Sequence, residues 1–256
     1  MNRQDELNNG LAATKNLSEC LSIDQEHLIK QVLSTLFDME SLNTLLSTLE
    51  ENRTLGILPR MRLIGKLLAK TFNDPTQKSK VTCAFSTHIS DTVRGWACFM
   101  IPAQQPEPSL AEQLKLIRTF ADDDHFGVRE WAWMAVRPMI ESHIDEAITL
   151  LMPWVYESSP YLRRFAVECI RPRGVWSRHI PALKENPALA LSLLEPLKNE
   201  PEVYVQDSVA NWLNDASKSQ PDWIYQLCTR WQKESQTKNT QRIAKRALRS
   251  INKSKK

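Results

Sequence analysis

Apolar residues recur at helical spacing along nearly the whole chain. Val205, Val209, Trp212, Leu213 and Ala216 stand at i, i+4, i+7, i+8 and i+11, which is one face of a helix. Alternating strand patterns longer than four residues are absent, and most prolines fall between the periodic segments, where a helix can begin or end. The pattern predicts an all-α protein with helices at residues 24–37, 39–50, 58–72, 78–88, 91–101, 109–121, 126–137, 143–155, 160–171, 178–184, 187–197, 202–217, 221–234 and 239–252.

The chain also contains an internal repeat. Residues 128–138, VREWAWMAVRP, align without gaps on residues 162–172, LRRFAVECIRP, and related segments begin with an apolar residue at positions 93, 205 and 243. A two-helix unit of about 35–45 residues whose second helix opens with V-R-x-x-A is typical of HEAT-like helical hairpins. One hairpin cannot bury its apolar face alone. We therefore expect stacked hairpins that form a curved α-α superhelix, a solenoid with a concave groove lined by the second helices.

The spacing of the repeats also predicts the domain organisation. We expect residues 1–256 to form one repeat domain, with residues 1–22 as a candidate irregular N-terminal segment. The step from position 162 to position 205 is the longest, and it contains a stretch around residues 171–180 that must leave the regular stack.

The net charge of +3 conceals an uneven distribution. Residues 160–256 contain 18 lysines and arginines and 9 aspartates and glutamates, a net charge of +9, so the remainder of the chain carries −6. A basic half indicates a polyanionic partner, and residues 126–256 are the predicted partner-facing half. The alternative is that the basic helix faces are simply solvated.

Several common kinds of site are excluded by the absence of their motifs. The chain has no GxGxxG, GxxxxGK[ST], HExxH, CxxC or GxSxG string, and its five cysteines are scattered, as expected for reduced thiols. His125, His143 and His179 lack metal-ligand partners at useful spacing, so we expect neither a metal nor a cofactor. The longest uncharged run, 95–106, is too short to cross a membrane, and the N-terminus has no apolar signal core. We therefore expect a cytoplasmic protein without membrane contact.

Candidate chemistry gathers in the basic half. Glu168 lies on a helical stripe with Arg164 and Arg171, opposite the apolar face, and Pro172 then breaks the helix before an irregular segment that carries Trp176. Asp215 occupies the same side one repeat later. An aromatic ring beside a basic groove can stack on a sugar or base. Cations that can neutralise phosphates are Arg163, Arg164, Arg171, Arg173, Arg178, Lys218, Arg242, Lys245, Arg246 and Arg249.

Each of these features has a structural alternative. The Arg164–Glu168 and Glu168–Arg171 spacings are those of surface ion pairs, and Asp215 and Lys218 have the spacing of a local pair. Trp176 has the alternative of packing in the core, which is more common for a tryptophan than serving as a platform for a ligand. In the helix 126–137, the corresponding stripe carries Glu130, with Trp133 beside it, as further candidates for catalysis or contact with the ligand.

Five stretches, and two runs within them above all, carry a family resemblance. Residues 164–176 follow R-x-x-x-E-x-x-R-P-R…W, and residues 209–218 follow V-A-N-x-L-N-D-x-S-K. With them, the chain resembles the DNA alkylation repair glycosylases of the AlkC/AlkD superfamily, which are built from HEAT-like repeats, and it is more similar to the AlkC branch. The stretches are 55–72, 126–138, 159–176, 194–223 and 242–251.

The resemblance implies an activity and a set of residues. It implies removal of cationic N3- and N7-alkylated purines, of the 3-methyladenine and 7-methylguanine type, from duplex DNA, without base flipping. It further implies Glu168, Trp176 and Asp215 as catalytic residues, with Glu130 as a weaker candidate. A cationic purine leaves without protonation, so a carboxylate need only stabilise the oxocarbenium-like sugar and orient a water. Which of Glu168 and Asp215 has which role stays open.

Two other classes of function share parts of this pattern. A HEAT-repeat protein that binds branched or damaged DNA without catalysis would have the same basic groove, and a glycosylase assay separates it from an enzyme. A HEAT-repeat scaffold for proteins would present an apolar or acidic groove, against which the +9 half argues. We expect a monomer whose partner is double-stranded DNA containing alkylated bases.

Overall fold

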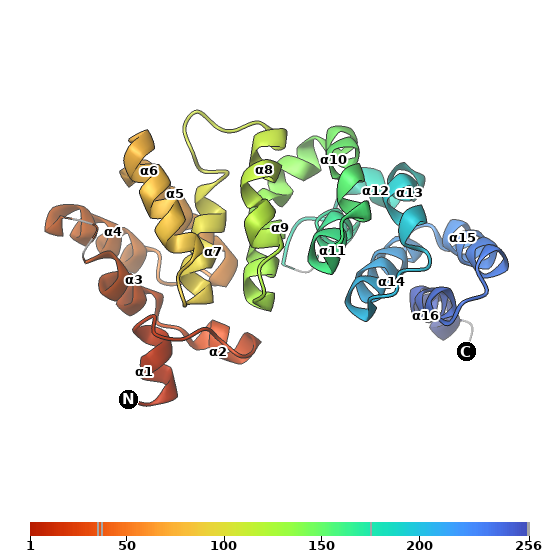
Figure 1. Ribbon diagram of the computed structural model, residues 1–256, viewed down its shortest axis with the longest axis horizontal. Helices are drawn as coiled ribbons and strands as arrows, with labels where there is room; N and C mark the ends of the chain where they lie inside the picture. The colour runs from red at the N-terminus through yellow and green to blue at the C-terminus, as the bar shows by residue number, and fades with distance from the viewer. Residues whose placement is uncertain (35, 37, 175, 255–256) are drawn as a thin grey trace. The chain divides into compact units, whose positions relative to one another are not determined.

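The protein is built from helices throughout the part of the chain that the structure describes (Figure 1). The computed structural model describes residues 1–34, 36, 38–174 and 176–254. The all-α prediction is confirmed over this range. The chain divides into two compact units, residues 1–136 and 137–256, so the single domain expected over residues 1–256 stays a prediction.

The first unit consists of short N-terminal helices followed by longer helical hairpins. Its helices are α1 (Arg3–Asn8), α2 (Leu17–Ser22), α3 (Gln25–Leu33), α4 (Met39–Glu51), α5 (Ile57–Thr71), α6 (Pro75–Ser86), α7 (Asp91–Met100), α8 (Leu110–Ala121) and most of α9 (Phe126–Ser142). The predicted helix 24–37 corresponds to α3, and its residues 35 and 37 lie outside the described residues.

The N-terminal segment 1–22, expected as a candidate irregular region, contains α1 and α2. Both begin at an asparagine, Asn2 or Asn16, whose side chain accepts a hydrogen bond from the backbone N–H three residues later. The segment is tied to α7 because the buried Asp91 carboxylate accepts hydrogen bonds from the Thr14 N–H (2.8 Å) and hydroxyl (2.9 Å). The helical periodicity of residues 1–22 is too short to reveal either helix, whereas the caps and the Asp91 contact stabilise them.

The helix α9 continues through a proline, where the sequence predicts a helix end at residue 137. Pro138 lies inside α9. A proline lacks the N–H that would bond to the carbonyl four residues earlier. The Arg62 guanidinium donates to that carbonyl, on Met134, at 3.3 Å. The side-chain donor partly replaces the missing backbone donor.

The second unit holds the candidate chemistry. After the end of α9 it contains α10 (Ile144–Leu151), η1 (Met152–Tyr156), α11 (Pro160–Glu168), α12 (Pro181–Glu185), η2 (Pro187–Ala190), α13 (Leu191–Leu194), η3 (Glu195–Leu197), α14 (Val203–Ser217), α15 (Pro221–Glu234), α16 (Lys238–Ala247) and α17 (Arg249–Ser254). Figure 1 shows α14 beside α11 and α16, with α15 completing a hairpin on α14.

The predicted repeat is visible in the residues that each second helix buries. The apolar residues that open the repeated pattern in α7, α9, α11, α14 and α16 are all buried: Val93, Val128, Leu162, Val205 and Ile243. Each second helix therefore packs its apolar face against its neighbours, as stacked hairpins require. The helical-hairpin repeat is confirmed within each unit.

The arginine of the V-R-x-x-A pattern joins consecutive repeats. Arg163 of α11 donates to the carbonyls of Glu157 (2.7 Å) and Ser158 (2.8 Å) in the preceding loop, and it forms an ion pair at 2.8 Å with Glu200, just before the next second helix. In the first unit, Arg94 of α7 pairs in the same way with Asp123 (3.0 Å), which precedes α9. Each acid stands five residues before the apolar residue that opens the repeated pattern in the next second helix, Val128 or Val205.

We predict that Arg163→Ala destabilises the fold. The substitution leaves the buried Glu200 carboxylate without its guanidinium and frees two loop carbonyls. We expect the free energy of unfolding to fall by about 1–3 kcal/mol, measured by urea unfolding. The control Lys198→Ala breaks ion pairs that are more exposed and should cost less than about 1 kcal/mol. Equal effects of the two substitutions would contradict the structural role of Arg163.

Candidate functional site

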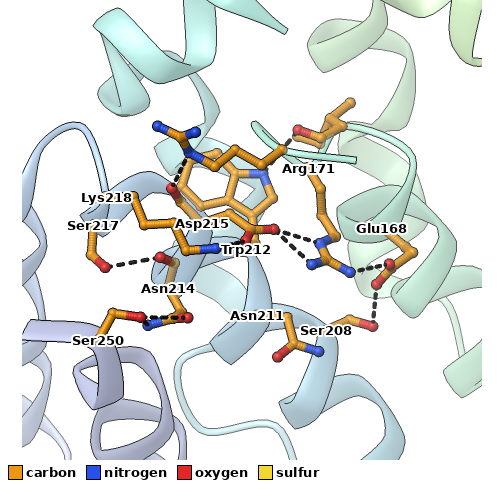
Figure 2. A network of polar contacts seen from close by, with 12 residues as sticks. Glu168, Arg171, Ser208, Asn211, Trp212, Asn214, Asp215, Ser217, Lys218 and Ser250 are labelled. Atoms are coloured by element: carbon orange, nitrogen blue, oxygen red, sulfur yellow. Dashed lines mark hydrogen bonds and ion pairs between the residues drawn. The ribbon is translucent and has the colours of Figure 1, made fainter. Parts of the chain in front are cut away.

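The Arg171 guanidinium joins the two predicted carboxylates. Its Nη1 donates to Glu168 Oε1 at 2.8 Å, while Nε and Nη2 donate to Asp215 Oδ2 at 2.9 and 2.6 Å (Figure 2). Glu168 and Asp215 come from consecutive second helices, α11 and α14, and are 47 positions apart. The structure thus brings together two acids that the sequence placed on the same side by repeat alignment alone.

The end of α11 places Arg171 between the acids. The predicted helix reaches residue 171, but α11 ends at Glu168. Pro172 has no N–H for the carbonyl of Glu168, which accepts instead from the N–H of Arg171 at 3.3 Å. The tightened last turn directs the Arg171 side chain toward α14. The buried Trp212 indole donates to the Ile170 carbonyl at 3.1 Å and fixes α14 in this register.

Glu168 is a buried carboxylate with a complete set of donors. Besides Arg171, the Ser208 hydroxyl donates to Oε2 at 2.7 Å, and Arg164 Nη2 lies 3.8 Å from the same oxygen. Burial raises the pKa of the Glu168 carboxyl. The charges of Arg164 and Arg171 and the hydrogen bonds to the carboxylate outweigh burial, so its pKa lies below the ordinary value. Glu168 is therefore ionised at neutral pH.

The two oxygens of Asp215 have unlike partners. Oδ2 is held by two nitrogens of Arg171, a guanidinium that is itself mostly buried. Oδ1 lies 3.1 Å from Nζ of Lys218, a side chain that is 45% exposed. The two oxygens therefore differ in how readily their partners can be displaced.

The stripe that the sequence places on the groove side is largely buried. Arg164 is 9% exposed, and Glu168 and Asp215 are 4% exposed. The ion pairs weighed as surface pairs do form, at 3.8 Å for Arg164–Glu168 and 2.8 Å for Glu168–Arg171, but they form out of water. Opposite charges at i, i+3 and i, i+4 attract one another across the helix face, and α14 covers them.

Trp176 lies on the irregular segment that follows α11. It is 53% exposed, unlike a core aromatic, and its backbone has a φ of 68°, in the left-handed region. Residue 175 lies outside the described residues. Because an L residue rarely adopts this conformation, the segment around Trp176 must be held by its surroundings.

A buried arginine outside the predicted set holds this segment. Arg137 is 1% exposed, and its guanidinium donates to the carbonyls of Cys169 (2.8 Å), Arg171 (2.6 Å) and Arg178 (3.0 Å). It thereby binds both ends of the segment that carries Trp176. The repeat alignment offered a signal, since Arg137 aligns with Arg171. Ser208 gave no such signal, because one serine in a helix has no distinctive spacing.

The predicted cations near α11 differ in their surroundings. Arg163 is engaged with Glu200, and the Arg164 guanidinium lies 4.5 Å from the ring centroid of Tyr204. Arg173 donates to the Asp215 carbonyl at 3.2 Å and to the Ser219 hydroxyl at 2.8 Å. The side chain of Arg178 is exposed.

The remaining predicted cations lie on the C-terminal helices. Arg242 and Arg246 of α16 both pair with Asp207 of α14, at 2.7 and 3.1 Å. Lys245 of α16 and Arg249 of α17 are exposed. Two guanidiniums share a single carboxylate, so this face keeps a surplus of positive charge.

Glu130 and Trp133 belong to the first unit. The Trp133 indole is buried, and its N–H donates to Glu130 Oε2 at 2.8 Å. The two candidate residues are therefore hydrogen-bonded to one another. Glu168 and Asp215 belong to the second unit.

Metal-binding clusters and membrane-spanning helices are absent from the described residues. Within them, no three His, Cys, Asp or Glu side chains group so that they could hold a metal ion. No helix in the same range has the length and apolar character needed to cross a membrane. All five cysteines are free thiols, and four of them are buried.

Comparison with known proteins places the chain among relatives. The family model described as DNA alkylation repair enzyme matches residues 94–251. The uncharacterized protein YhaZ of Bacillus subtilis strain 168 is 30% identical over 224 residues, which cover 84% of this chain and 60% of YhaZ.

Solved structures share the fold. The AlkC alkylpurine DNA glycosylase of Pseudomonas fluorescens, bound to DNA containing an abasic-site analog, matches with a TM-score of 0.69 and 23% identity, over 93% of this chain and 65% of that one. AlkD2 of Streptococcus mutans matches with a TM-score of 0.61 and 24% identity, over 81% and 97%. The chain therefore spans about three fifths of YhaZ and two thirds of the AlkC chain, and at these identities the structures establish the helical-repeat fold.

The lowered pKa of Glu168 predicts how stability depends on pH. A carboxyl whose pKa is lower in the folded than in the unfolded protein contributes stability above the ordinary glutamate pKa of about 4.3. That contribution is lost as the pH falls through the folded value. We expect Glu168→Gln to destabilise the protein most near neutral pH, with the difference in unfolding free energy shrinking as the pH falls below the ordinary glutamate pKa. Urea unfolding of both proteins across this range measures it, and a difference that grows on acidification would contradict the assignment.

Proposed function

Because the chain belongs to the DNA alkylation repair enzyme family, we propose that it is a DNA glycosylase. Its substrates are cationic N3- and N7-alkylated purines in duplex DNA, and it hydrolyses their N-glycosidic bond. The observation that carries this proposal is the pair of carboxylates, Glu168 and Asp215, that Arg171 holds within one basic unit.

Removal of a cationic base requires mainly that the protein supply a fixed negative charge near the sugar. An alkylated purine that already carries a positive charge leaves without a general acid. The sugar then develops oxocarbenium character at C1′, which a preorganised carboxylate stabilises. Arg171 fixes one oxygen of Asp215 with two hydrogen bonds, so this carboxylate needs little reorganisation when the charge develops.

We assign different tasks to the two acids. Both oxygens of Glu168 are occupied, by Arg171 and by Ser208, and Glu168 anchors the far side of the guanidinium. Asp215 has one oxygen whose partner is an exposed lysine. Asp215 is therefore the carboxylate that stabilises the sugar cation and orients the attacking water, and Glu168 positions Arg171.

Trp176 supplies an aromatic surface. Its side chain is half exposed on a segment that Arg137 secures at both ends. An indole at this position can pack on the deoxyribose or on the cationic base, where the positive charge strengthens the contact. We propose that the base is not moved into a deep pocket, so that bulky cationic adducts are released as well as methylated ones.

DNA is the partner that the charge distribution favours. The +9 of residues 160–256 includes exposed cations on α16 and α17 that can neutralise phosphates. The AlkC protein of similar fold was solved with DNA containing an abasic-site analog, and an abasic site is the product that base removal leaves.

We predict that Asp215→Asn and Glu168→Gln each lower base release by about 100-fold or more. Single-turnover release of 3-methyladenine and 7-methylguanine from methylated DNA, detected by mass spectrometry, measures the effect. DNA affinity should stay near that of the wild type, since both acids would repel phosphates rather than bind them. Full activity of both variants would contradict the proposed carboxylate mechanism.

The matched control is Glu234→Gln on α15. Glu234 is also a carboxylate in ion pairs, with Lys198 and Arg230, but it lies outside the Arg171 network. We expect wild-type release from this variant. Wild-type protein that binds methylated DNA and releases no base would identify a non-catalytic DNA-binding protein instead.

We also predict that Lys245→Ala weakens DNA binding without changing the chemical step. Lys245 is exposed on α16, and loss of one phosphate contact lowers the slope of log affinity against log salt by about 1. Binding measured at several salt concentrations tests this. An unchanged slope would exclude Lys245 from the interface.

A further inference from the structure

Lys218 occupies an unusual place beside the candidate carboxylates. It follows the last residue of α14, and its Nζ lies 3.1 Å from Oδ1 of Asp215, one helical turn earlier. Its side chain is 45% exposed, whereas the side chain of Asp215 is 6% exposed and that of Arg171 is 14% exposed. One partner of Asp215 is therefore in solvent and the other is buried.

The two cations differ in how firmly they hold the carboxylate. Arg171 uses a planar fork, with two nitrogens on Oδ2, and is also fixed by Glu168. Lys218 is an ammonium on a flexible four-carbon stem, which can turn to another anion with little loss. The Lys218 ammonium is also in contact with solvent, so water and salt screen its attraction to Asp215 more than they screen that of the buried Arg171. A competing anion can therefore remove Lys218 from Asp215, while Arg171 keeps the carboxylate in place.

The charges around Asp215 favour such an anion. Four cations stand against three carboxylates here: Arg164, Arg171, Arg173 and Lys218 against Glu168, Asp215 and Asp222. Arg173 is close by, since it donates to the Asp215 carbonyl. The network carries a surplus positive charge, which one phosphodiester would neutralise.

There is also room for a phosphate beside Lys218. A cavity of about 720 Å³ is lined by Lys218, with Tyr225 and Ser250 among its other walls. Asp222 contributes a carboxylate to the same lining. The cavity therefore suits a single phosphate next to the ammonium rather than a row of them.

We infer that Lys218 is a displaceable cap on Asp215. A backbone phosphate of bound DNA takes the Lys218 ammonium from Oδ1, and this oxygen is then free to face the sugar cation. Lys218 is thus a phosphate-binding and positioning residue that makes full activity depend on correctly seated DNA. The inference rests on the proposed function, because it concerns the carboxylate assigned to catalysis there.

The first test compares Lys218→Ala with the wild type on DNA containing one 7-methylguanine. We expect the affinity for DNA to fall about 3- to 10-fold, through loss of one phosphate contact. The single-turnover rate at saturating DNA should stay at the wild-type value or rise, since the cap is gone. A fall in this rate comparable to that of Asp215→Asn would overturn the inference, because the ammonium would then act in the reaction itself.

The second test identifies the phosphate. Each linkage within several nucleotides of the lesion is replaced in turn by an uncharged methylphosphonate. For one linkage we expect the saturating single-turnover rate of the wild type to drop about tenfold, because a neutral group cannot draw Lys218 from Asp215. The same linkage should leave the rate of Lys218→Ala unchanged.

The control variant is Lys233→Ala. Lys233 is an exposed lysine of α15, and this variant should respond to the methylphosphonates as the wild type does. If every linkage affects the wild type and Lys218→Ala alike, Lys218 is an ordinary surface ion pair and the inference fails. Such a result would not affect the proposed glycosylase activity. Wild-type protein that releases no base from any substrate would contradict both the proposed function and this inference.

Discussion

The guanidinium of Arg171 is the interaction on which the candidate site depends. It holds Glu168 of one repeat and Asp215 of the next by three hydrogen bonds, and it lies where α11 has just ended. Without it, two buried carboxylates would lose the cation they share, which costs several kcal/mol. Burying such a network contributes little net stability, because desolvation offsets the attraction. Its arrangement is better explained by the need for a negative charge of fixed position.

The repeat architecture uses the same helix positions for different tasks. Arg137 and Arg171 align in consecutive repeats, yet one binds backbone carbonyls around the Trp176 segment while the other binds carboxylates. Arg163, near the start of its helix, joins its repeat to the next through Glu200. The partner of each arginine depends on the segment that its side chain reaches. A regular loop offers an acid before the next helix, whereas the insertion after α11 offers free carbonyls.

Asp215 has one buried and one exposed cationic partner. Its buried partner, Arg171, fixes the carboxylate, and we propose that a phosphate displaces its exposed partner, Lys218. A site of this kind combines preorganisation with a dependence on the anion that displaces the lysine. The cations around Glu168 also favour its ionised form, as its lowered pKa illustrates.

Periodicity and composition by themselves determined the helices, the hairpin repeat and the gathering of chemistry in the basic half, because each depends on local spacing or on residue counts. The sequence also indicated Glu168, Trp176 and Asp215, through repeat alignment and the family resemblance. Only the tertiary structure decided that α9 passes through Pro138, that Arg171 lies between the acids, and that Arg137 and Ser208 take part. These features depend on contacts between residues 34 to 72 positions apart. Such residues meet only after the helices have packed, so no local sequence pattern predicts their contacts.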